Sequence, residues 1–107
     1  MKESGLITAI CHYLQYLENQ NKLIYIRNNS GAFINPRGGF YRMGKRGSAD
    51  IMVFMPKGIT LHLEAKVGKN KQNLSQLEME IKLKQLGHLY FIIFSVDEVE
   101  KIIKRYL

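Results

Sequence analysis

Cysteine and long apolar runs are both scarce in this sequence of 107 residues. Its one cysteine, Cys11, has no partner for an internal disulfide, which fits a reducing compartment. The longest apolar run, residues 89–94, is far too short to cross a bilayer. Glu3, His12 and Gln15 interrupt any apolar stretch near the N-terminus, so the pattern of a signal peptide is missing as well. We therefore expect an intracellular protein that has no membrane partner.

Acidic residues are also few, and their positions say more than their number. The chain has 16 lysines and arginines against 9 aspartates and glutamates, which gives a net charge of +7. No acid occurs between Glu18 and Asp50, and none between Glu64 and Glu78, although both stretches carry several basic residues. Asp50 and Glu64 are therefore isolated carboxylates in a basic stretch. Such a charge distribution attracts phosphate backbones, although a generic solvated basic surface would have the same composition.

Hydrophobic patterning predicts one α/β domain over residues 1–107, with a mixed β-sheet flanked by helices. Between residues 32 and 46 the chain is rich in glycine, aromatic and basic residues, so we expect mostly mobile loop there, with room for a short strand at residues 40–43. The apolar run at residues 89–94 is typical of a central strand covered on both faces. The other predicted elements are a helix over residues 3–18, a strand over residues 23–27, a hairpin over residues 49–66, a helix from Ser75 to about Leu86, and a last helix that begins after Ser95.

The helix after Ser75 has a start signal and two apolar sides. Ser75 and Glu78 have the spacing of a capping box, with Leu74 and Met79 as the hydrophobic staple beside it. The apolar residues form two groups that point to different sides, Leu77 with Ile81, and Met79 with Leu83 and Leu86. We expect one group to pack on the sheet. The other then needs cover from the last helix or from a partner subunit in a homodimer.

The hairpin at residues 49–66 has its turn at residues 56–58, and the turn length sets the pairing of its strands. Met55 pairs with Ile59, and every earlier pair follows from that one. One face is then wholly apolar, with the pairs Met55/Ile59, Val53/Leu61, Ile51/Leu63 and Ala49/Ala65. On the other face Asp50 lies directly opposite Glu64, and Lys66 follows on the same side.

Two carboxylates placed opposite each other on neighbouring strands repel, because their Cβ atoms are roughly 4.5–5.5 Å apart. Protonation of one acid, neutralisation by Lys66, or a divalent cation between the acids would each relieve the repulsion. Carboxylate oxygens are the ligands that Mg²⁺ prefers, and a site of this kind keeps waters that can be activated. Gln76, one short loop beyond Lys66, can face the same pair of acids.

These features together resemble a known enzyme family. Asp50, the tripeptide Glu64-Ala65-Lys66, the turn that begins at Gly47 and the glutamine Gln76 are similar to the motifs of the PD-(D/E)XK nuclease superfamily. The chain looks most like a stand-alone VRR-NUC domain (virus-type replication-repair nuclease), the small form found in phages and prophages. The resemblance covers nearly the whole chain, includes Glu3 in the first helix, and implies a restriction-endonuclease-like core.

The resemblance implies a Mg²⁺- or Mn²⁺-dependent endonuclease that nicks branched DNA, similar to Holliday-junction resolvases, as a homodimer in the host cytoplasm. Asp50, Glu64 and the backbone carbonyl of Ala65 would bind the metal. Lys66 would position the attacking water and stabilise charge in the transition state. Gln76 matches the family's motif glutamine, and Glu3 matches its first-helix acid. The proline that precedes the motif aspartate in the family is Ala49 here.

Basic residues around the acids are the predicted DNA contacts: Arg27, Arg37, Arg42, Lys45, Arg46, Lys69 and Lys71. Phe33, Phe40 and Tyr41 lie among them, and either stack on exposed bases or fill the core.

Other interpretations fit the same residues. A non-catalytic module would bind DNA with Asp50, Glu64 and Lys66 as a structural ion pair. A restriction-like nuclease would cut linear duplex DNA. The pattern His62-x-Glu64 has the form of a deaminase H-x-E motif, but the pair of cysteines that deaminases need is absent. His62 is then either a neighbour of the acids near DNA or a partly buried histidine of the sheet.

Overall fold

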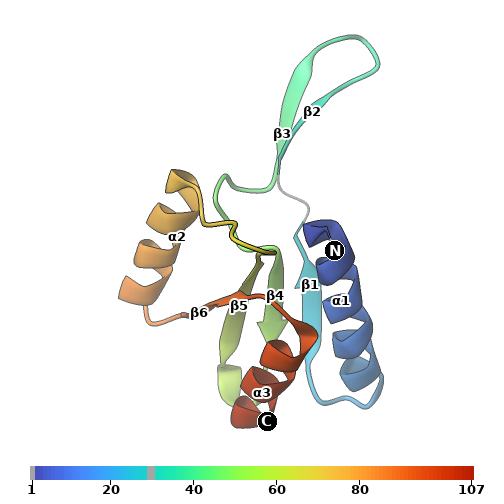
Figure 1. Cartoon of the computed structure of the whole chain (residues 1–107), viewed down its shortest axis with the longest axis vertical. Coiled ribbons are helices and arrows are strands. Elements are labelled where there is room, and N and C mark those ends of the chain that lie inside the picture. The colour runs from blue at the N-terminus through green and yellow to red at the C-terminus, as the bar shows by residue number, and fades with distance from the viewer. Residues whose placement is uncertain (1, 29–30) are drawn as a thin grey trace.

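The protein is a four-stranded sheet with helices on both faces and a separate two-stranded hairpin that projects from one end (Figure 1). The computed structural model describes residues 2–28 and 31–107, except for the side chains of residues 31–33 and 41–43. The elements are α1 (Glu3–Asn19), β1 (Ile24–Arg27), β2 (Gly31–Ile34), β3 (Phe40–Met43), β4 (Ile51–Phe54), a short 3-10 turn at Pro56–Gly58, β5 (Thr60–Ala65), α2 (Leu74–Gln85), β6 (Leu89–Ile93) and α3 (Val96–Tyr106). Among the described residues, no helix is both long and apolar enough to cross a membrane.

The predicted hairpin at the centre of the chain is confirmed. β4 and β5 are antiparallel, with Ile51 opposite Leu63 and Val53 opposite Leu61. The N–H of Met55 donates to the carbonyl of Ile59 at 2.8 Å, which closes the hairpin at the predicted pair. The apolar face of this hairpin is the floor of the core. Helices α1 and α3 cover it with Leu6, Ile10 and Leu14 and with Val99, Ile102 and Ile103, all of which are buried.

β6 is an edge strand of this sheet, whose order is β1-β4-β5-β6, so the predicted central position is wrong. β6 runs parallel to β5, and its alternate residues face the two sides of the sheet. Phe91 points toward α3, where it packs against Tyr106, while Ile92 points toward α2 and lines a hollow with Leu77. The continuous apolar run is therefore explained by the helices that cover both faces of β6. An edge strand can be covered on both faces in this way although it has only one neighbouring strand.

Helix α2 begins at Leu74, earlier than predicted, because Asn73 and not Ser75 is its N-cap. The Asn73 side chain accepts a hydrogen bond from the Gln76 N–H at 2.9 Å, and the Gln76 side chain accepts one from the Asn73 N–H at 3.0 Å. The capping box predicted for Ser75 and Glu78, and the staple beside it, are therefore wrong. The same reciprocal motif forms two residues earlier, and it places Gln76 at the third helical position.

The two apolar groups of α2 are covered less than expected, since none of its residues is buried. Leu77, Ile81 and Leu86 are exposed, and Met79 and Leu83 are half-buried. α3 does not supply the second cover, because it packs with α1 on the opposite face of the sheet (Figure 1).

Residues 31–43 form a hairpin and not the expected mobile loop. The short strand predicted at residues 40–43 is β3, and it pairs with the unpredicted strand β2, with Ile34 opposite Phe40. These two strands form a sheet of their own.

Candidate active site

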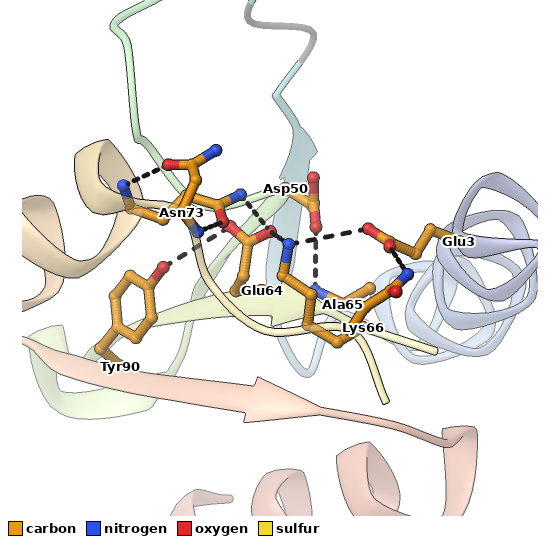
Figure 2. A network of polar contacts seen from close by, with 9 residues as sticks. Glu3, Asp50, Glu64, Ala65, Lys66, Asn73 and Tyr90 are labelled. Carbon is orange, nitrogen blue, oxygen red and sulfur yellow. Dashed lines mark hydrogen bonds and ion pairs between the residues drawn. The ribbon is translucent and has the colours of Figure 1, made fainter. Parts of the chain in front are cut away.

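The two isolated acids lie together at one end of the central hairpin (Figure 2). Asp50 precedes β4, and its carboxylate Oδ2 accepts a hydrogen bond from the backbone N–H of Ala65 at 2.8 Å. Its carbonyl oxygen accepts a hydrogen bond from the N–H of Asn28, which follows β1. Asp50 thus continues the register of β4 and stands opposite Glu64, as predicted.

Glu64 projects from β5 on the same side as Asp50, and it is only 1 % exposed. Its Oε2 accepts a hydrogen bond from Gln76 Nε2 at 2.9 Å, and its Oε1 accepts one from the Tyr90 hydroxyl at 3.5 Å. Burial, and then the adjacent Asp50, raise the pKa of Glu64 to about 8. The uncharged form of Glu64 is favoured because the carboxyl group is buried and lies beside a second acid.

Lys66 is buried and lies between two acids that come from different parts of the chain. Its Nζ is 3.8 Å from Glu64 Oε2 and 3.9 Å from Glu3 Oε1. The other oxygen of Glu3 accepts a hydrogen bond from Asn70 Nδ2 at 2.8 Å. The structure therefore brings Glu3, at the start of α1, to the other predicted site residues. Figure 2 shows Lys66 between Glu64 and Glu3.

Gln76 links the helix cap to the acids. Its carbonyl oxygen caps the backbone of Asn73, while its amide nitrogen donates to Glu64. Because the oxygen and the nitrogen of the Gln76 amide are both hydrogen-bonded, the orientation of the amide is fixed. The position of Glu64 Oε2, which accepts a hydrogen bond from this amide, is then fixed as well.

Gly47 brings the turn before Asp50 into contact with the first turn of α2. Its φ angle is +82°, and a Cβ atom there would lie 2.2 Å from the carbonyl oxygen of Ser75. Only glycine suits this position. Other residues rarely adopt a positive φ, and every other residue carries the Cβ atom that would clash with Ser75. The predicted turn residue thus sets the distance between α2 and the acids.

The predicted basic residues lie on several segments of the chain. Lys69 and Lys71 are exposed on the loop after Lys66, and Lys45 and Arg46 are exposed between β3 and β4, beside α2. Arg37 is exposed at the tip of the projecting hairpin. Arg27, on β1, is exposed and donates a hydrogen bond to the Thr8 hydroxyl. Arg42 lies in β3, and its side chain falls outside the described part of the structure.

His62 is a buried histidine of the sheet, as one of the two sequence interpretations had it. Its ring lies 5.4 Å from that of His88 and is stacked at 6.5 Å on Tyr90, measured between ring centres. Burial, and then His88, lower the pKa of His62. Its Nε2 atom has no hydrogen-bond partner among the described residues. His62 lies beside Tyr90, and among the described residues the side-chain hydrogen bonds of Glu64 come from Gln76 and Tyr90 and not from His62.

Sequence reasoning missed Tyr90, Asn70 and Asn73. The asparagine at position 73, three residues before a glutamine, is itself a capping signal and was available from the sequence. To place Tyr90 at the site, one has to know the parallel register of β5 and β6, in which His62 lies opposite Tyr90. Asn70 lies in a loop with no periodic signal.

The donor set at this site fits a hard divalent cation. Among the described residues, no three His, Cys, Asp or Glu side chains are close enough to hold a metal by themselves. Asp50 and Glu64 provide two carboxylates. Ala65 adds a backbone oxygen, because the N–H and C=O of one residue in an extended strand point toward the same neighbouring strand, here toward Asp50. Two carboxylates and a carbonyl suit Mg²⁺ or Mn²⁺, which keep waters in their remaining positions.

The four-stranded mixed sheet with helices on both faces agrees with the core that the resemblance implied. Comparison with solved structures makes this more specific: a structure described as "VRR_NUC domain" matches over 100% of both chains, with a TM-score of 0.66 and 18% sequence identity. This chain therefore has the fold of a VRR_NUC domain, as the resemblance implied. No family model and no curated protein matches the sequence.

Proposed function

We propose that this protein is a metal-dependent, structure-selective DNA endonuclease that hydrolyses phosphodiester bonds in branched DNA such as Holliday junctions. The observation that carries the proposal is the buried Glu64 opposite Asp50, with Lys66 Nζ at 3.8 Å and Gln76 Nε2 at 2.9 Å. A structural ion pair alone explains this arrangement poorly, because Glu64 has a raised pKa despite Lys66.

Each residue then has a task. Asp50, Glu64 and the Ala65 carbonyl would hold Mg²⁺ or Mn²⁺, and the bound metal would lower the pKa of a water and offset charge on the phosphate. Lys66 positions that water and stabilises the developing oxyanion. Gln76 and Tyr90 orient the Glu64 carboxylate. Glu3 is a positioning residue, since it holds the ammonium of Lys66.

The proposed DNA substrate follows from the distribution of exposed basic residues. The exposed residues Lys45, Arg46, Lys69 and Lys71 lie on the segments that directly precede and follow the acids. They are suited to the phosphates on either side of the scissile bond.

A four-way junction presents two equivalent strands, so a homodimer with two-fold symmetry suits it. Helix α2 leaves Leu77, Ile81 and Leu86 exposed, which provides apolar surface for a second copy. We also propose that the enzyme acts in the cytoplasm of a phage or prophage host, in agreement with a cysteine, Cys11, that is buried as a free thiol.

The test is incubation of the protein with matched linear, flap and four-way-junction DNAs in Mg²⁺ or Mn²⁺, with Lys66→Ala as the inactive control. Paired symmetric nicks near the crossover, absent with EDTA and with Lys66→Ala, are expected. Cutting of linear duplex alone would indicate a restriction-like enzyme. DNA binding without metal-dependent cutting would reject the nuclease.

A further inference from the structure

The β2–β3 hairpin is an arm with a well-ordered tip. Its two strands form a sheet of their own, and the arm projects away from the four-stranded sheet (Figure 1). At the tip, Asn35 Oδ1 accepts hydrogen bonds from the N–H groups of Arg37 and Gly39, both at 2.9 Å. The N–H of Asn35 donates to the carbonyl of Gly39 at 2.8 Å. The asparagine therefore holds the tip in one conformation.

Two large apolar side chains stand beside this tip in solvent. Ile34 and Phe40 are cross-strand partners, and they are 66 % and 78 % exposed. Most of the surface of both side chains is therefore in contact with water. An isolated two-stranded hairpin is only marginally stable. A solvent-exposed aliphatic and aromatic pair at its far end is therefore unexpected unless the pair contacts a binding partner.

The base of the arm is tied to the acid site. The Asn28 side chain donates to the Ser48 hydroxyl at 2.7 Å and to the Ala49 carbonyl at 3.1 Å. Its backbone N–H donates to the carbonyl of Asp50 at 2.8 Å. The chain segments before and after the arm, at Asn28 and at residues 48–50, are therefore held together at Asp50. A strand of four residues spans roughly 13 Å, so the tip reaches several base pairs away from Asp50, given a rise of about 3.4 Å per base pair.

The charge of the arm indicates what it contacts. No acidic residue occurs between Glu18 and Asp50, whereas Arg37 is exposed at the tip and Lys45 and Arg46 at the base. A basic ribbon with an exposed aromatic side chain suits a nucleic acid, whose phosphates pair with the cations and whose bases stack on the ring.

We propose that Phe40 and Ile34 form a wedge that inserts at a branch point of DNA, with Arg37 on the adjacent backbone. The proposal rests on the proposed function, because it takes DNA as the substrate. Apolar side chains of this kind insert between base steps elsewhere, at the cost of unstacking the bases. That cost is least where bases are already unpaired or loosely stacked, so the wedge favours branched over linear DNA.

The test uses the full chain and four-way junctions that carry 2-aminopurine at one position near the crossover, in EDTA so that no cutting occurs. Wild-type protein is expected to raise the fluorescence, because the probe base becomes unstacked. Phe40→Ala is expected to abolish the rise and to weaken junction binding about 5- to 150-fold, the effect of losing one aromatic–base stack. Binding to linear duplex changes little. The Phe40→Trp variant, which retains an aromatic ring, is expected to keep both the fluorescence rise and the affinity for the junction.

Phe54→Ala is the matched control, since Phe54 is 39 % exposed at the end of β4 far from Asp50. It is expected to leave fluorescence and junction affinity unchanged. Circular dichroism confirms that each variant is folded.

Unchanged fluorescence and affinity with Phe40→Ala would overturn the wedge, even if the protein cuts junctions. Unstacking by a wild-type protein that never cuts in Mg²⁺ or Mn²⁺ would support the wedge and reject the nuclease. A change of oligomeric state in Phe40→Ala, without an effect on DNA, would mean that the arm contacts a second copy, and would also overturn the proposal.

Discussion

Gln76 donates a hydrogen bond to Glu64 at 2.9 Å while the other end of the same amide caps its own helix at Asn73. One side chain thus joins the start of α2 to the most deeply buried acid of the site. The bond accounts for how a helix with no buried residue is held in register with the sheet. It also makes the geometry of Glu64 depend on a helix cap.

Gln76→Ala is expected to weaken Mn²⁺ binding or cleavage about 10- to 100-fold, as loss of a residue that orients a metal ligand does. It also removes one capping bond, which costs about 1 kcal/mol of stability. Asn73→Ala is the control, because it removes the other capping bond and leaves the contact with Glu64. Calorimetry of Mn²⁺ binding and thermal unfolding measure the two effects. Equal loss of Mn²⁺ affinity in both variants would mean that Gln76 acts only as a cap.

The raised pKa of Glu64 predicts how stability depends on pH without metal. In the folded protein the pKa is about 8, against 4.5 for the ordinary group, so folding takes up a proton between these values. This group's contribution is therefore fully present below about pH 4.5 and is lost as the pH rises through about 8. Glu64→Gln removes that dependence. The expected result in EDTA is that the variant gains stability relative to wild type from pH 5 to pH 9, by a few kcal/mol at most, in thermal or urea unfolding.

Mn²⁺ should reverse that loss, because the cation compensates the same negative charge. Stabilisation of wild type by Mn²⁺ is expected to be larger at pH 8.5 than at pH 6, where binding must displace a proton. The Glu64→Gln variant should show little stabilisation at either pH. A shift of melting temperature that is the same at both pH values, or the same in the variant, would place the metal elsewhere.

Lys66→Ala is expected to lower the single-turnover cleavage rate about 10²- to 10³-fold, the usual effect of removing one group that stabilises developing charge. Mn²⁺ affinity should not fall, because the variant loses a positive charge next to the acids. Lys69→Ala is the matched control, since it removes the same charge from an exposed position nearby. It should change DNA affinity and its dependence on salt, and leave the rate with bound DNA unchanged. Similar rates for both variants would contradict the role of Lys66.

Gly47→Ala is expected to destabilise the protein and to weaken Mn²⁺ binding, because the added Cβ would lie 2.2 Å from the carbonyl of Ser75 and push α2 from the acids. Gly58→Ala is the control, with a φ of +75° and nothing within 4 Å of the added atom. It incurs only the conformational cost of about 1 kcal/mol. Thermal unfolding and Mn²⁺ calorimetry compare them. If Gly47→Ala costs no more than Gly58→Ala, the contact between the turn and α2 is not what positions the site.

Several parts of the site could be predicted from the sequence because they depend on short-range rules. The alternation of residues along β4 and β5 and the length of their turn together place Asp50 opposite Glu64 and Lys66 on the same side. The apolar spacing in α1 and the Ser95 cap of α3 are equally local, and both are confirmed. The helix cap at Asn73 is also local, but the sequence interpretation assigned the cap to Ser75 with Glu78, which has the same capping-box spacing, and so missed Asn73.

The hairpin, its register and the pairing of the two acids could be predicted from local patterns, because they follow from neighbours along the chain. The edge position of β6, the projection of residues 31–43 as an arm, and the contacts of Glu3 with Lys66 and Asn70 depend instead on tertiary packing. The bond between Asn70 and Glu3 joins residues 67 positions apart. Contacts over such separations depend on how whole elements pack, and no local period or spacing encodes them.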